Sequence, residues 1–329
     1  MTVLVTGGAG YIGSHAVYEL IDAGERVVVL DNLSTGFLSA LPDPAMAIIG
    51  DAGDQALVAK LIDTHQVDSI VHFAASIVVP ESVRDPLGYY RNNTVNSRAL
   101  IETAIKGGVR YFIFSSTAAV YGNPERVPVG EDAALVPVSP YGWSKLMTEV
   151  MLRDAAAAHG LGYVILRYFN VAGADPKQRT GQSTPNATHL IKVAVQAALG
   201  VSPLLEVFGA DYPTPDGTCV RDYIHVTDLS RAHRAALDYL RRGGASSIVN
   251  CGYGRGYSVL EVINAVRRVA GTDLPLRMAP RRLGDPVSLV ADATRIRALF
   301  GWVPEFNDLD TVVAHALAWE RRLTVTRNC

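Results

Sequence analysis

Cysteine is scarce in this chain of 329 residues, which has only Cys219, Cys251 and Cys329. The number is odd and no two cysteines have the CxxC spacing, so we expect neither a disulfide framework nor a metal site. We expect free, reduced thiols, as is usual in the cytoplasm. The first ten residues, MTVLVTGGAG, have neither the basic start nor the apolar stretch of a signal peptide, which also favours a cytoplasmic location.

An excess of charge and a long apolar run are also missing. Lys plus Arg number 30 and Asp plus Glu number 32, so the formal net charge is −2. The densest basic cluster is the pair Arg281–Arg282, too small to indicate a nucleic-acid partner. No apolar run reaches the roughly 18 residues of a membrane span. Because 49% of the residues are hydrophobic, we expect a folded protein rather than a disordered one.

The first half of the chain alternates short apolar runs with helical patterns. The runs are apolar on both faces, as central parallel strands are, and lie at Thr2–Thr6, Arg26–Leu30, Ala47–Ile49, Ser69–His72, Tyr111–Phe114 and Tyr163–Tyr168. The helical patterns lie at Tyr11–Ala23, Asp54–Thr64, Asn92–Ile105 and Ser144–His159. This alternation predicts an α/β fold with a Rossmann-type, doubly wound parallel sheet.

After about residue 175 the pattern loosens. Loops rich in Gly, Pro, Asp and Thr are expected at Ala174–Pro185 and Gly209–Gly217, and helices at Ala187–Leu199, Thr227–Arg241, Val259–Ala270 and Leu309–Arg322. We predict two domains, residues 1–175 and residues 176–329, the second a smaller, loop-rich α/β domain that binds the substrate. The segment at about 219–241 is expected to return and pack on the first domain.

Residues 6–13 read TGGAGYIG, and their glycines follow the first predicted strand and open the first helix. Gly7, Gly10 and Gly13 would allow a tight turn and the close approach of a pyrophosphate to the helix N-terminus. An incidental turn is the alternative. Asp31 ends the second strand, where its carboxylate suits ribose hydroxyls and repels a 2′-phosphate, so NAD is favoured over NADP. For Asp31, a helix cap is the alternative.

Other strand ends face the same predicted crevice. Asp51 follows the third strand and the small residues Ala74 and Ala75 follow the fourth. Asn92 and Asn93 come at the start of the next helix, where at least one of them could serve only as a cap. The predicted cofactor contacts are Gly7, Gly10, Tyr11, Ile12, Gly13, Asp31, Asn32, Asp51, Ala52, Phe73, Ala74, Ala75, Asn93, Ser115, Tyr141, Lys145 and Tyr168.

Tyr141 and Lys145 are four residues apart, so they share one helix face. A cation about 4 Å away, at an effective dielectric constant of about 20, is worth roughly 4 kcal/mol or about three pKa units. Lys145 and a positive nicotinamide would thus bring the pKa of Tyr141 towards neutrality, where a general base works best. Thr117, at the end of the fifth strand, could bond the same substrate oxygen. An ordinary surface Tyr/Lys pair is the alternative.

Taken together, the motifs resemble the UDP-glucose 4-epimerase family of the extended short-chain dehydrogenase/reductase superfamily, over nearly the whole chain. The motifs are TGGAGYIGSH at 6–15, DNLSTG at 31–36, FIFSSTAAVYG at 112–122, SPYGWSKLMTE at 139–149, LRYFNVAGA at 166–174, FGADYPTPDGTCVRDYIHVTDL at 208–229 and PRRLGD at 280–285. The first and fourth are shared across the superfamily, whereas 208–229 is far more specific to this family. The resemblance implies that Tyr141 is the catalytic base, Lys145 its partner and Thr117 the assisting hydroxyl.

The resemblance also implies which residues hold the substrate. Asn170 matches an asparagine at the phosphate region of the sugar nucleotide, and Arg221 matches a residue that grips the diphosphate. For Arg221 a structural salt bridge with Asp222 is the alternative. The predicted substrate contacts are Thr117, Tyr141, Asn170, His189, Phe208, Arg221, Arg282, Asp285 and Leu289; the predicted metal ligands are none.

The implied reaction interconverts UDP-glucose and UDP-galactose by transient oxidation at C4, rotation of the 4-keto intermediate and re-reduction, with NAD staying bound. A 4-epimerase of a UDP-N-acetylhexosamine or a UDP-pentose is the alternative. Related dehydratases carry an Asp-Glu pair directly after the active-site Thr, where this chain has Ala118 and Ala119, so dehydration is not expected. A non-catalytic NAD sensor would be expected to lack Tyr141 and Lys145. The resemblance implies a homodimer through two helices of the first domain.

Three positions depart from the family pattern. Ile77 stands where a lysine near the cofactor is often found, which leaves the strength of NAD retention open. His189 lies in a region where the family often has paired asparagines, and the resemblance implies that it takes the position of a contact to the uridine diphosphate. A purely structural histidine is the alternative. Leu289 stands where the family varies between tyrosine and smaller residues that admit an N-acetylated sugar. From its intermediate size we expect some activity on UDP-N-acetyl sugars.

Overall fold

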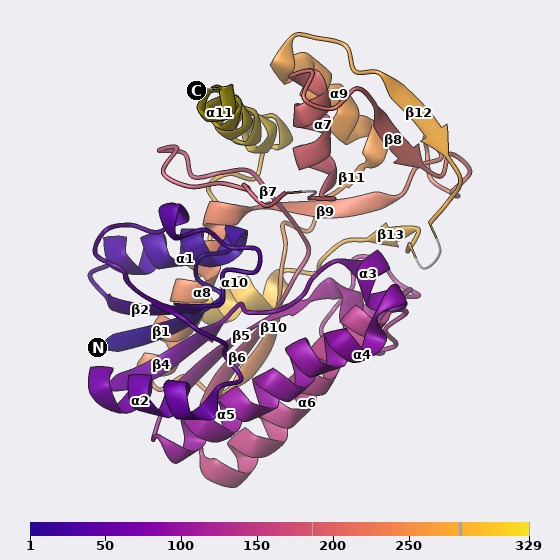
Figure 1. The fold of residues 1–329 in the computed structure, drawn as a ribbon. Coiled ribbons are helices and arrows are strands. Elements are labelled where there is room, and N and C mark those ends of the chain that lie inside the picture. The colour runs from indigo at the N-terminus through magenta and orange to yellow at the C-terminus, as the bar shows by residue number, and fades with distance from the viewer. Residues whose placement is uncertain (186, 283–284, 329) are drawn as a thin grey trace.

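The computed structural model describes residues 1–185, 187–282 and 285–328. Its centre is a seven-stranded sheet whose neighbouring strands are all parallel (Figure 1). In order across the sheet, the strands are β10 (Ser247–Cys251), β6 (Gly162–Tyr168), β5 (Tyr111–Thr117), β4 (Val67–His72), β1 (Thr2–Thr6), β2 (Arg26–Asp31) and β3 (Met46–Ile49). The chain order reverses between β1 and β4, which is where doubly wound sheets bind ligands. The predicted Rossmann-type fold is confirmed.

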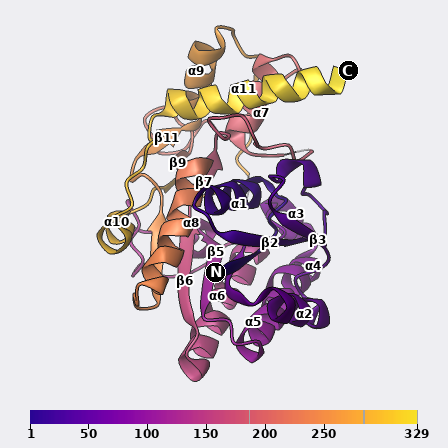
Figure 2. The same ribbon diagram turned by 90° about the vertical axis from the view of Figure 1, so that its left-hand side faces the viewer.

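Helices cover both faces of this sheet (Figures 1 and 2). One layer consists of α1 (Tyr11–Asp22) and α8 (Val226–Arg241), and the other of α2 (Gln55–His65), α5 (Asn96–Lys106) and α6 (Pro140–His159). Side chains of a strand alternate between the two layers because successive residues point to opposite faces. Thus Val3 and Val5 of β1 pack with α1 and α8, whereas Leu4 packs with the other layer.

Two helices in the first half of the chain begin at other residues than the sequence predicts. The helix predicted from Ser144 begins at Pro140, because Ser139 caps its N-terminus and proline is tolerated in a first turn. The helix predicted at Asn92–Ile105 begins as a π-helical turn, η2 (Tyr90–Val95), and continues as α5. Two further helices precede this turn and are too short to show a periodicity: α3 (Val79–Arg84) and α4 (Pro86–Tyr89).

A second lobe lies at the top of Figure 1 and joins the sheet at the carboxyl end of β6. Its helices α7, α9 and α11 share a hydrophobic core that includes Val195, Val262 and Val313. In Figure 2, α11 crosses the top of the molecule. The remaining elements are η1 (Leu38–Ala40), η3 (Ala118–Tyr121), β7 (Asn170–Ala172), α7 (Leu190–Ala198), β8 (Leu205–Phe208), β9 (Val220–His225), β11 (Gly256–Ser258), α9 (Val259–Ala270), β12 (Leu276–Ala279), β13 (Ser288–Leu289), α10 (Thr294–Phe300) and α11 (Leu309–Asn328).

The chain passes between the two lobes more than once. The sheet takes its edge strand β10 from residues 247–251, and α8 packs against α1. The division into domains at residue 175 stays a prediction, and the central sheet itself continues past that residue. Cys219 and Cys251 are buried and free, while Cys329 lies outside the described residues. In the part of the chain that the structure describes, no helix combines the length and the apolar character needed to cross a membrane.

Candidate active site

The glycine-rich turn joins the carboxyl end of β1 to α1. Gly7 has φ +71°, and a Cβ atom on it would lie 2.5 Å from the backbone nitrogen of Ala74. A Cβ atom on Gly13 would lie 2.1 Å from the carbonyl oxygen of Gly7. Gly10 is the N-cap of α1, and no side chain bonds the first N–H groups of that helix. Backbone donors and the positive end of the helix dipole are therefore free for an anion, which fits the diphosphate of NAD.

Asp31 holds the glycine turn from the neighbouring strand. Its Oδ2 accepts a hydrogen bond of 2.9 Å from the backbone N–H of Ala9, and its Oδ1 one of 2.8 Å from that of Leu33. Ala9 lies in the turn before α1, so Asp31 is not the cap of that helix. A carboxylate has about four lone-pair sites, so capacity remains for ribose hydroxyls.

The predicted residues after β3 and β4 line the same edge of the sheet. Asp51 accepts from Asn32 Nδ2 at 3.3 Å and from Asn96 Nδ2 at 2.9 Å, and Ala52 beside it is buried. The backbone N–H groups of Phe73 and Ala74 both donate to the carbonyl oxygen of Thr6, at 2.9 and 3.1 Å. This bond pair brings the segment Phe73–Ala75 against the glycine turn. Among the other predicted contacts, Tyr11, Ile12 and Tyr168 pack partly buried against the core.

Asn93 was predicted as a cofactor contact, but its side chain is occupied by protein partners. Its Oδ1 accepts from Ser76 N–H at 2.8 Å, and its Nδ2 donates to the Ser76 carbonyl oxygen at 2.9 Å and to Ser144 Oγ at 3.0 Å. Asn92 is less buried and donates to Ser76 Oγ. Asn93 thus ties the loop after β4 to α6, and its contact with the cofactor stays a prediction.

Tyr141 and Lys145 lie one turn apart on α6, both nearly buried, and face the end of β5. Lys145 Nζ donates to the carbonyl oxygen of Ser115 at 2.9 Å and lies 4.9 Å from the ring centre of Phe114. The hydroxyl of Thr117 bonds that of Tyr141. The structure therefore brings together the three residues predicted to carry the chemistry.

The pKa of Tyr141 differs from the sequence prediction. Burial raises it to about 12, and the hydrogen bond from Thr117 opposes part of that rise. The lowering expected from Lys145 is wrong for the protein alone, since the ammonium is turned towards the Ser115 carbonyl. Burial also lowers the pKa of Lys145 to about 7, with the Glu149 carboxylate acting in the opposite direction. Deprotonation of Tyr141 thus requires further positive charge, which an oxidised nicotinamide would provide.

Three predicted substrate residues come together around β9. Asn170 on β7 is paired in register with Tyr223, and Leu289 on β13 with Arg221. Arg221 is nearly buried, and its Nη1 donates to the carbonyl oxygen of Val220 at 2.8 Å. Along β9, the partners of Leu289 and Asn170 are therefore only two residues apart.

The alternative salt bridge between Arg221 and Asp222 is not formed. Asp222 instead accepts from the backbone N–H groups of Tyr253, Gly254 and Ala291, at 2.9, 2.9 and 3.2 Å. The Asp222 carboxylate is thus bonded to backbone N–H groups and not to Arg221. The guanidinium of Arg221 remains suited to an anionic ligand.

Arg282, Asp285 and Phe208 form one contact group. Arg282 Nε donates to Asp285 Oδ2 at 3.0 Å, and the guanidinium lies 4.7 Å from the ring centre of Phe208. The ion pair is partly exposed. Because neither side chain is enclosed, breaking this ion pair costs little free energy. Arg282 can therefore exchange Asp285 for a phosphate, and Asp285 can exchange Arg282 for ribose hydroxyls.

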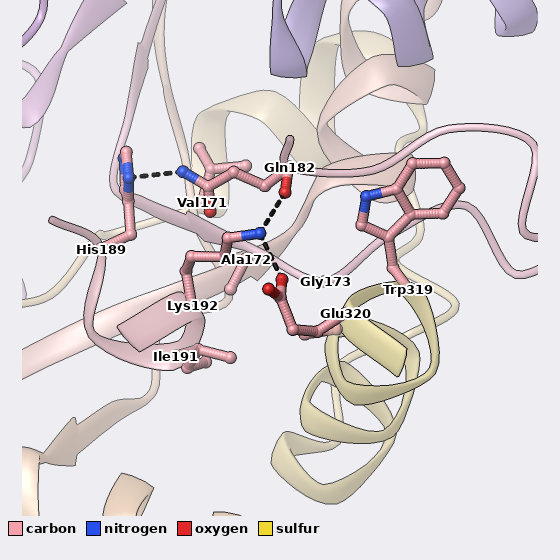
Figure 3. A pocket seen from close by; sticks show the side chains of 10 residues that line it. Val171, Ala172, Gly173, Gln182, His189, Ile191, Lys192, Trp319 and Glu320 are labelled. Carbon is pink, nitrogen blue, oxygen red and sulfur yellow. Dashed lines mark hydrogen bonds and ion pairs between the residues drawn. The ribbon is translucent and has the colours of Figure 1, made fainter. Parts of the chain in front are cut away.

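His189 directly precedes α7 and is bonded from a loop of the second lobe (Figure 3). Its Nδ1 lies 2.7 Å from Gln182 Nε2. An amide nitrogen can only donate, so Nδ1 is the acceptor and Nε2 carries the hydrogen. Burial lowers the pKa of His189, which keeps the ring neutral. Figure 3 also shows the buried ion pair of Lys192 and Glu320, which joins α7 to α11. Lys192 Nζ donates to the carbonyl oxygen of Gln182 as well, at 2.5 Å.

Sequence reasoning missed several residues that shape this site. His233 of α8 bonds the Ser115 hydroxyl, 118 residues away. No local sequence pattern could have predicted a contact between residues so far apart in the chain. Glu149 follows Lys145 by four residues, so the helical spacing was a usable signal. Its buried partner Arg167 comes from β6. The described residues contain no group of three or more His, Cys, Asp or Glu that could hold a metal ion.

Comparisons with known proteins agree with this arrangement. Residues 3–252 match the NAD dependent epimerase/dehydratase family. The chain is 60% identical to a UDP-glucose 4-epimerase of Azospirillum brasilense over 98% of this chain and 92% of that protein.

Solved structures are also similar over nearly their whole length. The UDP-glucose 4-epimerase of Brucella ovis, solved in complex with NAD, superposes with a TM-score of 0.94 at 45% identity, covering 96% of this chain and 97% of that one. The UDP-Glc/GlcNAc 4-epimerase of Campylobacter jejuni has a TM-score of 0.85 at 49% identity, covering 98% and 99%. The chain therefore belongs to the NAD dependent epimerase/dehydratase family, in which it is similar to UDP-glucose 4-epimerases from end to end.

Proposed function

We propose that this chain is an NAD-dependent 4-epimerase that interconverts UDP-glucose and UDP-galactose. The observation that carries the proposal is the placing of Tyr141, Thr117 and Lys145 at the carboxyl end of β5, beside a glycine turn that fits a dinucleotide. A base, a second hydroxyl and a cation at one point are what the oxidation of an alcohol requires. The identity of 60% to a UDP-glucose 4-epimerase supports the same substrate pair.

The chain's own residues divide the work. Tyr141 takes the proton from the 4-hydroxyl of the sugar and returns it after the sugar has turned, while Thr117 bonds the oxygen that loses and regains that proton. NAD, when bound, supplies the hydride acceptor and donor at C4. Asn170, Arg221 and Arg282 hold the nucleotide diphosphate, so that the keto sugar can rotate without leaving. Closely spaced guanidinium donors suit this anion.

A substrate panel tests the proposal. Purified protein, without added cofactor, is incubated with UDP-glucose, UDP-galactose, their N-acetylated forms and UDP-xylose, and the products are resolved by NMR. We expect the same mixture of the two hexose nucleotides from either starting side, together with NAD released on denaturation. Turnover of UDP-xylose alone, or no exchange of either hexose, would refute the proposed substrate.

A second candidate activity is the 4-epimerisation of a UDP-N-acetylhexosamine. Leu289 favours it, because this side chain belongs to the same buried apolar cluster as Ala118, the residue after Thr117, and Phe169, the residue before Asn170. A leucine here leaves more room beside the reacting sugar than a tyrosine would. The similar C. jejuni structure is described as a UDP-Glc/GlcNAc 4-epimerase. A UDP-pentose has no comparable observation in its favour.

We also propose that the chain forms a homodimer, in the cytoplasm. Trp143, Met147 and Val150 are exposed on one face of α6 at helical spacing, and Val95 is exposed at the end of η2, which packs on α6. Contiguous apolar surface of this kind typically marks an interface between proteins. Light scattering on the eluting protein should give twice the chain mass. Met147→Glu with Val150→Glu should give a monomer, whereas a wild-type monomer would refute the proposal.

A further inference from the structure

Three consecutive residues at the end of β5 each bond one side chain of α6. Residues 115, 116 and 117 bond, in this order, Lys145, Glu149 and Tyr141. These α6 residues are spaced four apart, so they form a single row on the helix face turned to the sheet. Glu149 is therefore the third member of the row that begins with the catalytic tyrosine and its lysine.

The Glu149 carboxylate is buried and held from several sides. Arg167 donates to both of its oxygens, with Nε at 3.1 and 3.2 Å and Nη2 at 2.7 Å. Both side chains are 2% exposed. Arg167 Nη1 also donates to Tyr121 at 3.1 Å, and that hydroxyl donates to Asn250 Oδ1 at 2.7 Å. A paired, fork-like geometry of this kind fixes a carboxylate in position as well as compensating its charge.

We propose that Glu149 is a positioning residue for the epimerisation, whose carboxylate keeps the Lys145 ammonium charged where it bonds the Ser115 carbonyl oxygen, one helical turn from Tyr141. The inference rests on the proposed function of this site. Burial opposes the charge of Lys145 and lowers its pKa to about 7, and Glu149 acts against that lowering. Once an oxidised nicotinamide favours the phenolate of Tyr141, an ammonium one helical turn away would support that anion, whereas a neutral Lys145 would not.

Other titratable groups around α6 do not take over this task. Burial lowers the pKa of His72 on β4 to about 3 and that of His233 on α8 to about 4, so both are neutral. Arg167 is positive and would disfavour the ammonium if Glu149 were removed. The groups facing this stretch from its neighbours are His72 (β4), Glu81 (α3), Tyr89 (α4), Tyr121 (η3), Arg167 and Tyr168 (β6) and His233 (α8). Among the described residues, Glu149 is the one whose charge raises the pKa of Lys145.

The test measures kcat against pH for two opposed variants. The active state needs an ionised Tyr141 and a charged Lys145, so loss of the Lys145 proton produces the descending limb of the profile. Glu149→Gln removes the negative charge and should move that limb to lower pH by about one unit or more, a loss of about tenfold at the alkaline end. Arg167→Met leaves the carboxylate uncompensated and should move the limb to higher pH.

Two further variants separate this role from a purely structural one. Glu149→Gln combined with Arg167→Met removes both charges without leaving one of them buried and unpaired, so it should fold and still show the acid shift. Asp228→Asn alters another fully buried carboxylate, bonded to Tyr253 and to two backbone N–H groups. Asp228→Asn should lower the stability of the fold and leave the descending limb of the kcat profile at the same pH. An equal loss of kcat at every pH in Glu149→Gln, or shifts of the same sign in the two single variants, would overturn the proposal.

A readout without turnover keeps this inference separate from the proposed function. The ¹³Cε chemical shift of Lys145 in labelled protein, followed against pH, reports the charge of the ammonium directly. We expect its midpoint to fall in Glu149→Gln and to rise in Arg167→Met. Failure of the UDP-hexose panel with these shifts present would refute the proposed reaction but not the electrostatic role. An unmoved midpoint would refute the role of Glu149 whatever the substrate.

Discussion

Lys145 and Ser115 are joined by a hydrogen bond of 2.9 Å from the side-chain ammonium to the backbone carbonyl oxygen. The Ser115 hydroxyl lies 2.7 Å from His233 Nε2, while His233 Nδ1 lies 2.9 Å from the carbonyl oxygen of Leu229. A carbonyl can only accept, so Nδ1 carries the hydrogen and the hydroxyl donates to Nε2. The end of β5 is thus fixed from α6 on one side and from α8 on the other.

Tyr141→Phe should abolish turnover. The variant keeps the ring and its packing but removes the group that transfers the proton, a contribution of about 10²–10⁴-fold in rate. We expect kcat to fall by at least that range, while the Kd for UDP, measured by titration calorimetry, and the amount of retained NAD stay close to those of the wild type. Activity within tenfold of the wild type would mean that Tyr141 is not the base.

Lys145→Met should inactivate the protein and stabilise it. Burial lowers the pKa of Lys145 from 10.5 to about 7, so below pH 10.5 the charged side chain costs folding free energy, up to about 5 kcal/mol at neutral pH. Methionine removes this cost but loses the bond to Ser115, so we expect a net gain of about 1–3 kcal/mol at pH 7 in urea unfolding.

The pH dependence of unfolding provides the check on Lys145. Between pH 7 and 10.5 the unfolded chain binds a proton that the folded chain does not, so wild-type stability should rise with pH across this window. This rise should be absent in Lys145→Met. A variant less stable than the wild type at pH 7, with an unchanged slope, would contradict the prediction.

Acid should destabilise the fold through buried histidines. Burial lowers the pKa of His15 and His233 to about 4 and that of His72 to about 3. Below pH 6.5 the unfolded chain binds protons at these positions while the folded chain stays neutral, so stability is lost as the pH falls from 6.5 towards 4. We expect a drop on the order of several kcal/mol between pH 7 and 5 in denaturant unfolding, reduced in His72→Gln. A flat profile would contradict it.

Leu289→Tyr should narrow the substrate range. Leu289 is nearly buried in one cluster with Ala118 and Phe169, so we expect a larger aromatic side chain to take up space beside the sugar. We expect kcat/KM for UDP-N-acetylglucosamine to fall at least tenfold and that for UDP-glucose to stay within about threefold, since a steric clash affects only the bulkier substituent. Leu289→Ile, of equal volume, is the control. An equal loss on both substrates would point to damaged packing.

Gln182→Glu should make the binding of UDP depend on pH through His189. The present amide donates to Nδ1, whereas a carboxylate would accept from it and favour the imidazolium. We expect the variant to bind UDP more tightly at pH 6 than at pH 8 in titration calorimetry, and the wild type to change little. Gln182→Met, which can neither donate nor accept strongly, should weaken binding at both values. Equal affinities at both pH values in the glutamate variant would exclude His189 as a diphosphate contact.

The amino-acid sequence by itself determined the parts of this protein that depend on neighbours along the chain. The apolar runs, the glycine turn before α1 and Asp31 at the end of β2 are local patterns, because a strand, a tight turn and a helix start each involve a few consecutive residues. Tyr141 and Lys145 were readable for the same reason, since helical geometry brings residues four apart onto one face.

Only the tertiary structure decided which distant side chains complete the site. Arg167 pairs with Glu149, His233 bonds Ser115, and β10 joins the sheet beside β6. The tertiary structure also determines that the side-chain amide of Asn93 bonds Ser76 and Ser144. It directs the Lys145 ammonium to a backbone carbonyl oxygen, so that burial is the largest influence on the pKa of Tyr141. Such contacts depend on how whole helices and strands pack and on which side chains that packing buries. No short stretch of sequence determines either the packing or the burial.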